Sequence, residues 1–146
     1  MAITQALANS FKKELLEAEH NFKQTGGDKF KIALYTSSAT LNSATTSFTT
    51  TNEVANSGQY VSGGGALSNL GTSIASGVAI VDYADRSFTG VTLTARGALI
   101  YNTSATVANA AVAALDFGAD KTATSGTFTI QFPAFTTSAA ILRISG

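Results

Sequence analysis

Residues 128–132 read Phe-Thr-Ile-Gln-Phe, and Pro133 follows directly. This strict alternation of apolar and polar side chains is the period of a β-strand that buries one face, and the proline ends the hydrogen-bonding ladder. A similar alternation runs through Phe30, Ile32 and Leu34 near the start of the chain. The period of two predicts a mainly β fold.

Turns that contain glycine separate further strand candidates. No helical period returns between these candidates, so the crossover helices that a parallel sheet requires are missing. We therefore expect an antiparallel β-sandwich or jelly-roll-like domain, with an open barrel as the alternative. The predicted strands cover residues 59–62, 66–70, 73–83, 86–88, 91–101, 111–117, 127–132 and 139–144.

One segment near the N-terminus has the period of a helix. Ser10 is the expected N-cap and Gly26-Gly27 the expected stop, which predicts one N-terminal α-helix over residues 10–23. Residues 1–9 either extend this helix upstream, because Ile3 and Leu7 continue its spacing, or form an arm or a frayed turn, which is the interpretation that we favour. The apolar face of this helix consists of Phe11, Leu15, Ala18 and Phe22.

The whole chain, residues 1–146, is predicted to be a single β-rich domain, with the helix at 10–23 and the antiparallel sandwich over 29–146. A chain near 150 residues buries roughly 68–70% of the surface that its unfolded form exposes, so it needs no cross-links to fold. The sequence has no cysteine. This excludes disulfides, zinc knuckles, iron–sulfur clusters and thiol catalysis.

Charge is scarce and balanced, with 9 Lys and Arg against 9 Asp and Glu. A protein that neutralises phosphates shows a basic surplus, so we expect no nucleic-acid partner. In place of charge the chain has 21 Thr and 15 Ser. A monomer with so few charged residues has little electrostatic repulsion to oppose association. This composition favours a protein that packs against neighbours, including copies of itself.

The segment 37–57 is a long polar connection, and such loops are commonly functional or mobile. The N-terminus lacks a basic region followed by an apolar stretch, so no secretory signal is expected. The longest apolar run, residues 110–115, is much shorter than the roughly 20 residues of a membrane-spanning helix. We expect a soluble protein without a membrane partner, made in the cytoplasm.

Few residues have the pattern of a chemical site. The single histidine, His20, is interpreted as a solvated helix residue. The acidic pairs Asp82/Asp85 and Asp116/Asp120 lack the ordered spacing of a calcium loop, and salt bridges and turn caps explain them more simply. The run 63–65, Gly-Gly-Gly, lacks the rest of a Walker motif and is interpreted as a flexible turn.

Other residues are interpreted structurally. Gly97 lies inside a strand pattern and indicates a bulge or a close backbone approach. Arg96 beside it is either an inter-subunit charge or an ordinary exposed strand residue. Nothing assembles a nucleophile, a base and an oxyanion hole, so we expect no enzyme, no catalytic, cofactor-binding or metal site, no cofactor and no small-molecule substrate. The expected aromatic core anchors are Phe11, Phe22, Phe30, Phe88, Phe117, Phe128 and Phe132.

Several segments, in order, resemble small proteins encoded in the structural gene blocks of tailed bacteriophages. The resemblance covers nearly the whole chain and implies no enzyme, cofactor or catalytic residue. The segments are residues 11–17 (FKKELLE), 20–22 (HNF), 30–41 (FKIALYTSSATL), 50–54 (TTNEV), 94–102 (TARGALIYN), 115–121 (LDFGADK) and 128–133 (FTIQFP).

The resemblance implies a virion structural protein, and we expect a capsid decoration (cement) protein on the capsid exterior. Its expected partners are the major capsid protein and copies of itself. The loop 37–57 and the N-terminal arm are the candidate contact segments. Such a protein would resist the outward pressure of packaged DNA by many weak, repeated contacts.

Two alternatives remain open. The first is a tail or neck component, such as a tube, adaptor or fibre-base protein. The second is a glycan-binding adhesion module, which would need exposed aromatic side chains such as Tyr60 or Tyr101.

Overall fold

A long antiparallel pair of strands, β6 (Arg86–Asn102) and β7 (Ala110–Ile130), forms the centre of the larger sheet. The computed structural model describes residues 2–134, 136 and 139–145. In these residues the larger sheet has five antiparallel strands in the order β1-β7-β6-β2-β3. Its other strands are β1 (Ala6–Leu7), β2 (Phe30–Tyr35) and β3 (Gly65–Ala66).

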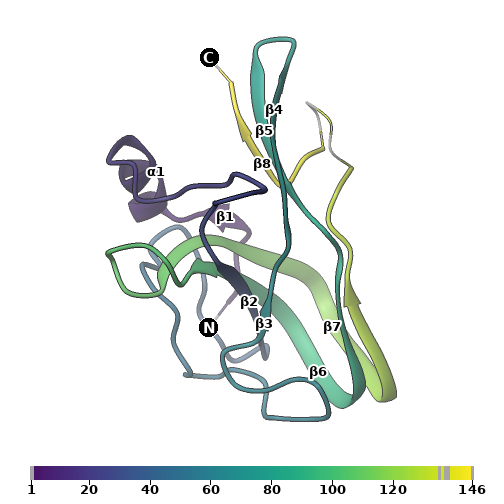
Figure 1. Cartoon of the computed structure of the whole chain (residues 1–146). Helices are drawn as coiled ribbons and strands as arrows, with labels where there is room; N and C mark the ends of the chain where they lie inside the picture. The colour runs from purple at the N-terminus through teal and green to yellow at the C-terminus, as the bar shows by residue number, and fades with distance from the viewer. Residues whose placement is uncertain (1, 135, 137–138, 146) are drawn as a thin grey trace.

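A second sheet stands beyond the long ribbon (Figure 1). It has the antiparallel order β4-β5-β8, and the described residues contain one helix, α1, at the side of the molecule (Figure 1). The predicted fold, a mainly β antiparallel sandwich with one N-terminal helix, is confirmed. These elements are β4 (Asn69–Ala75), β5 (Val78–Tyr83), β8 (Leu142–Ile144) and α1 (Asn9–Leu16).

The long ribbon has two halves with different environments. Residues 97–102 of β6 and 110–115 of β7 are all buried, so this half is covered on both faces. In the other half, buried Phe88, Val91 and Leu93 alternate with exposed polar residues. The ribbon therefore supplies the core at one end and an exposed face at the other.

The helix prediction is wrong in extent. α1 spans Asn9–Leu16 rather than 10–23, and Ala8, not Ser10, occupies the N-cap position without a side-chain hydrogen bond. The helix ends because Ala18 adopts φ 59°, and the amides of Ala18 and Glu19 then bond back to the last turn. This is the Schellman arrangement, so the chain reverses eight residues before Gly26.

Several predicted strand boundaries are also wrong. The predicted strand 73–83 is a hairpin, because Ser76 (φ 49°) and Gly77 (φ 75°) form a tight turn between β4 and β5. The four candidates at 86–88, 91–101, 111–117 and 127–132 fuse into β6 and β7, with register shifts at the bulges. β7 ends at Ile130, so residues 131–132 lie outside the strand and its ladder stops before Pro133 is reached. Residues 59–62 form no strand, and Tyr60 makes only an isolated bridge.

The chain ends depart from expectation as well. Residues 1–9 are not a loose arm from Ala2 onward: Ile3 bridges Leu41, and β1 pairs with β7. The predicted strand 139–144 shortens to β8, Leu142–Ile144. The polar connection 37–57 is irregular, as predicted, but it packs on the core through Ala39, Leu41 and Val54.

Candidate functional site

The exposed half of the β6–β7 ribbon presents a surface of neutral hydroxyls, which we call the hydroxyl face: Ser87, Thr92 and Thr94 on β6, and Thr122 and Thr129 on β7. All five residues are exposed. Hydroxyl pairs span the two strands at 2.8 Å, Ser87 with Thr129 and Thr94 with Thr122. A hydroxyl both donates and accepts, so this face can bond a partner without the cost of desolvating charges.

One ion pair borders the hydroxyl face. Arg96 Nε donates to Asp120 Oδ1 at 2.8 Å across the strands, with both side chains partly exposed. Arg96 therefore has an ion-pair partner within its own chain, and its interpretation as an inter-subunit charge stays a prediction. Surface pairs of this kind contribute little to stability.

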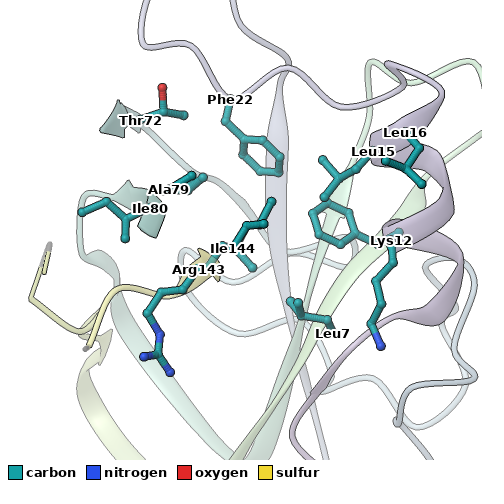
Figure 2. A pocket seen from close by; sticks show the side chains of 13 residues that line it. Leu7, Lys12, Leu15, Leu16, Phe22, Thr72, Ala79, Ile80, Arg143 and Ile144 are labelled. Atoms are coloured by element: carbon teal, nitrogen blue, oxygen red, sulfur yellow. The ribbon is translucent and has the colours of Figure 1, made fainter. Parts of the chain in front are cut away.

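An apolar groove lies between α1 and the smaller sheet (Figure 2). Its volume is about 400 Å³, and its charged lining residues are Lys12 and Arg143. Leu16 on its rim is 91% exposed and Ile144 is 59% exposed. The sequence prediction missed this groove, although Leu16, adjacent to Leu15 and off the buried helical face, was a signal of it.

The interpretation of His20 as a solvated helix residue is wrong. His20 lies beyond α1 and is 8% exposed, packed against Phe11 with ring centroids 4.8 Å apart. Its Nε2 lies 2.9 Å from Glu14 Oε1, and its Nδ1 lies 2.9 Å from Asn102 Nδ2. Because the Asn102 amide donates, Nδ1 accepts and Nε2 carries the proton that is donated to Glu14.

Asn102 extends this buried network to the next loop. Its Nδ2 also donates to Asp28 Oδ2 at 2.7 Å, and its Oδ1 accepts from the amides of Ser104 and Ala105. Both imidazole nitrogens are therefore occupied by structural partners. The network joins α1, the following loop and the end of β6.

The acidic pairs serve as local caps and bridges, and Asp120 pairs with Arg96 rather than with the adjacent Lys121. Asp82 accepts from the amide of Tyr83, and Asp116 accepts from that of Gly118. Asp85 accepts from the amide of Phe132. Within the described residues, no group of three or more His, Cys, Asp or Glu is placed to share a metal ion.

The turn at Gly63-Gly64 and the close backbone approach at Gly97 are confirmed, whereas Gly65 belongs to β3. Gly63 and Gly64 adopt φ values of 97° and 81° in a turn, and a Cβ at Gly64 would overlap the Ile32 carbonyl. Gly97 lies at a register shift against β7, where a Cβ would overlap the Leu115 carbonyl. Of the seven expected aromatic anchors, Phe117 and Phe132 are only partly buried.

The tyrosines that a glycan-binding module would need are in the core. Tyr60 is fully buried, and its hydroxyl accepts from the Leu34 amide and donates to Glu53, both at 2.8 Å. Tyr101 is 2% exposed, and its hydroxyl donates to the Gly63 carbonyl. Burial, followed by the charge of Glu53, raises the pKa of Tyr101 to about 12. Neither ring is available to stack on a sugar.

Comparisons with protein-family models, with curated proteins and with solved structures find no match for this chain. In the described part of the chain, no helix has the length and apolar character needed to cross a membrane. The candidate functional regions are therefore the two surfaces described above, the hydroxyl face and the apolar groove.

Proposed function

We propose that this chain is a structural protein of a tailed-bacteriophage particle, a decoration protein that binds the outer surface of the capsid. The observation that carries the proposal is the hydroxyl face, a broad exposed surface held by cross-strand hydrogen bonds such as Ser87 with Thr129. The resemblance of the sequence to bacteriophage structural proteins supports it. The partners in this role are the major capsid protein and further copies of the chain.

The structure of the β6–β7 ribbon is suited to binding a large surface such as the capsid. The half of β6–β7 that carries the hydroxyl face is continuous with the half buried on both faces, so the exposed surface is fixed to the core. A preordered surface loses little conformational entropy when it binds. Many copies, each with modest affinity for the shell, would then attach firmly because neighbouring contacts raise the effective concentration.

The proposal also assigns contact segments. The loop 37–57 retains exposed residues such as Thr40, Thr50 and Thr51 and stays a candidate for the capsid contact. The N-terminal segment is a weaker candidate, because Ile3, Ala6 and Leu7 pair within their own domain.

Cryo-electron microscopy of the virion tests the location directly. We expect density for the sandwich on the capsid exterior in hundreds of copies. Density in the tail or neck alone would overturn the proposal and favour a tube, adaptor or fibre-base protein.

A binding experiment tests the surface. Thr94→Lys places a charge on the hydroxyl face, and we expect its affinity for emptied capsids to fall at least about tenfold, which corresponds to about 1.4 kcal/mol. Thr25→Lys adds the same charge at an exposed threonine in a distant turn and should bind like the unmodified chain. Equal binding of the two variants would show that the hydroxyl face is not the contact.

A further inference from the structure

The four outer strands of the two sheets differ in how well they are protected from other chains. In the described residues, β1 and β3 have two residues each, and β8 has three and carries Arg143. β4 has seven residues, and the sequence holds no charged residue between Glu53 and Asp82. Natural edge strands are usually blunted by shortness, charge or proline, and β4 has none of these.

The turn geometry shows which backbone groups of β4 point outward. The two-residue turn at Ser76 and Gly77, both with positive φ, makes Ala75 and Val78 a hydrogen-bonded pair. Pairs then alternate along the hairpin, so the N–H and C=O groups of Thr72 and Ile74 face away from β5. Within the described residues these groups have no partner on that side.

Only the outer part of β4 is free. At its base, Asn69 Nδ2 donates to the carbonyls of Lys23 and Asp28 at 3.2 and 3.0 Å, which ties that end to the preceding loop. Farther out, Ile74 is 76% exposed, and Thr72 to Ala75 are all exposed. The hairpin projects beyond the main sheet, where another chain can reach it (Figure 1).

An apolar row crosses the smaller sheet beside this edge. Ile74 lies opposite Ala79, and Ala79 lies opposite Ile144, so the three side chains share one face. Ile74 and Ile144 are mostly exposed. The row ends at the unpaired edge of β4, where the Ile74 side chain is exposed to solvent.

We propose that the β4 edges of two copies of this chain pair antiparallel about a two-fold axis at Ser73. Thr72 of one copy then lies opposite Ile74 of the partner subunit, and their outward groups form four hydrogen bonds. The edge fits a second copy because its outward-facing residues are symmetric about Ser73 and neither copy brings a charge. The two Ile74 side chains lie diagonally about 7–8 Å apart and cover the ends of both apolar rows.

The pairing is independent of the capsid role, and its test uses the purified full-length chain. Size-exclusion chromatography with light scattering should give twice the 14.9 kDa mass of one chain. Hydrogen exchange at the amides of Thr72 and Ile74 should slow in the dimer. A single-chain mass up to about 1 mM protein, where even a millimolar complex is half formed, would overturn the proposal.

Variants at the edge locate the contact. Ile74→Pro removes an outward N–H without touching the ladder to β5, and it should yield a folded monomer. Ile74→Lys and Ile74→Glu should each be monomeric, and mixing them should restore a dimer, because the two side chains lie within reach across the axis. Ile144→Lys, on the same face at the opposite edge, should remain dimeric.

One outcome would overturn the β4 contact, and another would separate that contact from the capsid role. A dimer that dissociates on Ile144→Lys but not on Ile74→Pro would overturn the β4 contact in favour of another surface. A dimer that behaves as expected yet has no affinity for capsids would support the β4 contact and contradict the decoration function.

Discussion

At the scale of single residues, His20 fixes the path of the chain between α1 and β2. Its ring packs among Phe11, Phe22 and Phe30 while its two nitrogens bond Glu14 and Asn102. A buried polar group without a partner is costly, so this network specifies one arrangement of the loop. Ala18 is a non-glycine residue with positive φ. The chain reversal there is stabilised because it allows His20 to be buried with its hydrogen-bond partners.

Replacing His20 should therefore lower the free energy of unfolding, because the hydrogen-bond network is then incomplete. We expect His20→Leu to destabilise the fold by about 2–3 kcal/mol, because Glu14 is left buried without its partner. The double variant Glu14→Leu/His20→Leu should recover part of this loss, since both members of the pair are then apolar. Urea denaturation measures the effect, and a cost for His20→Leu below about 0.5 kcal/mol, typical of a surface site, would contradict the role of the network.

At the scale of elements, the sequence predicted which segments are strands better than where they end. β2 and the strand at 128–130 follow from alternation, because each buries a continuous face. The fusion of 86–88 with 91–101 could not be predicted, since Gly90 (φ 64°) reads equally as a turn or as a bulge inside one strand. Gly77 was among the glycines expected in turns, yet the predicted strand 73–83 ran across the Ser76-Gly77 turn.

The candidate surfaces, too, could be predicted from the sequence only in part. The richness in Thr and Ser predicted hydroxyl surfaces, but the pairing of Thr94 with Thr122 depends on the register between β6 and β7, which shifts at bulges on both sides of Thr94. The helix was overestimated because Ala18 and Phe22 continue the helical spacing of Phe11. Tertiary contacts of His20 decide otherwise, and no local pattern records them.

Two glycines with similar backbone angles allow a test of local packing. Gly64 (φ 81°) lies against the Ile32 carbonyl of β2, whereas a Cβ at Gly26 (φ 75°) would meet nothing within 4 Å. Gly26→Ala should cost about 1–2 kcal/mol from backbone strain alone. Gly64→Ala should cost about 1–3 kcal/mol more, because β2 or the turn must move. Thermal and urea denaturation compare the two, and equal losses would show that the close approach is not a constraint.

At the scale of the whole molecule, a chain with no net charge presents three adhesive features: the hydroxyl face, the apolar groove beside α1 and the free edge of β4. The hydroxyl face lies on the β6–β7 ribbon, whereas the groove and the β4 edge both involve the smaller sheet and share Thr72. A neutral chain has no long-range repulsion to keep copies apart. The contacts that we propose with neighbours would therefore depend on shape and hydrogen bonding rather than on charge.

The burial of the four tyrosines determines how the fold responds to alkali. Burial, the largest cause in each case, raises the pKa of the Tyr35, Tyr60, Tyr83 and Tyr101 hydroxyls, for Tyr101 to about 12. In the unfolded chain these groups lose their protons near pH 10, while the folded chain keeps them. The unfolded state then binds fewer protons, so the free energy of unfolding must fall as pH rises above about 10.

Denaturation curves between pH 8 and pH 12 test this sign. We expect constant stability up to about pH 9, followed by a decline that continues toward the folded-state pKa values. Tyr101→Phe removes one of the responsible protons, so its decline should be shallower, whatever its stability at pH 8. Phe48→Leu, which alters the ring stacked on Tyr101 at 4.7 Å without removing a proton, should keep the full slope. Stability that rises above pH 10 would mean that the tyrosine hydroxyls ionise more easily in the fold than in the unfolded chain, and would contradict their burial.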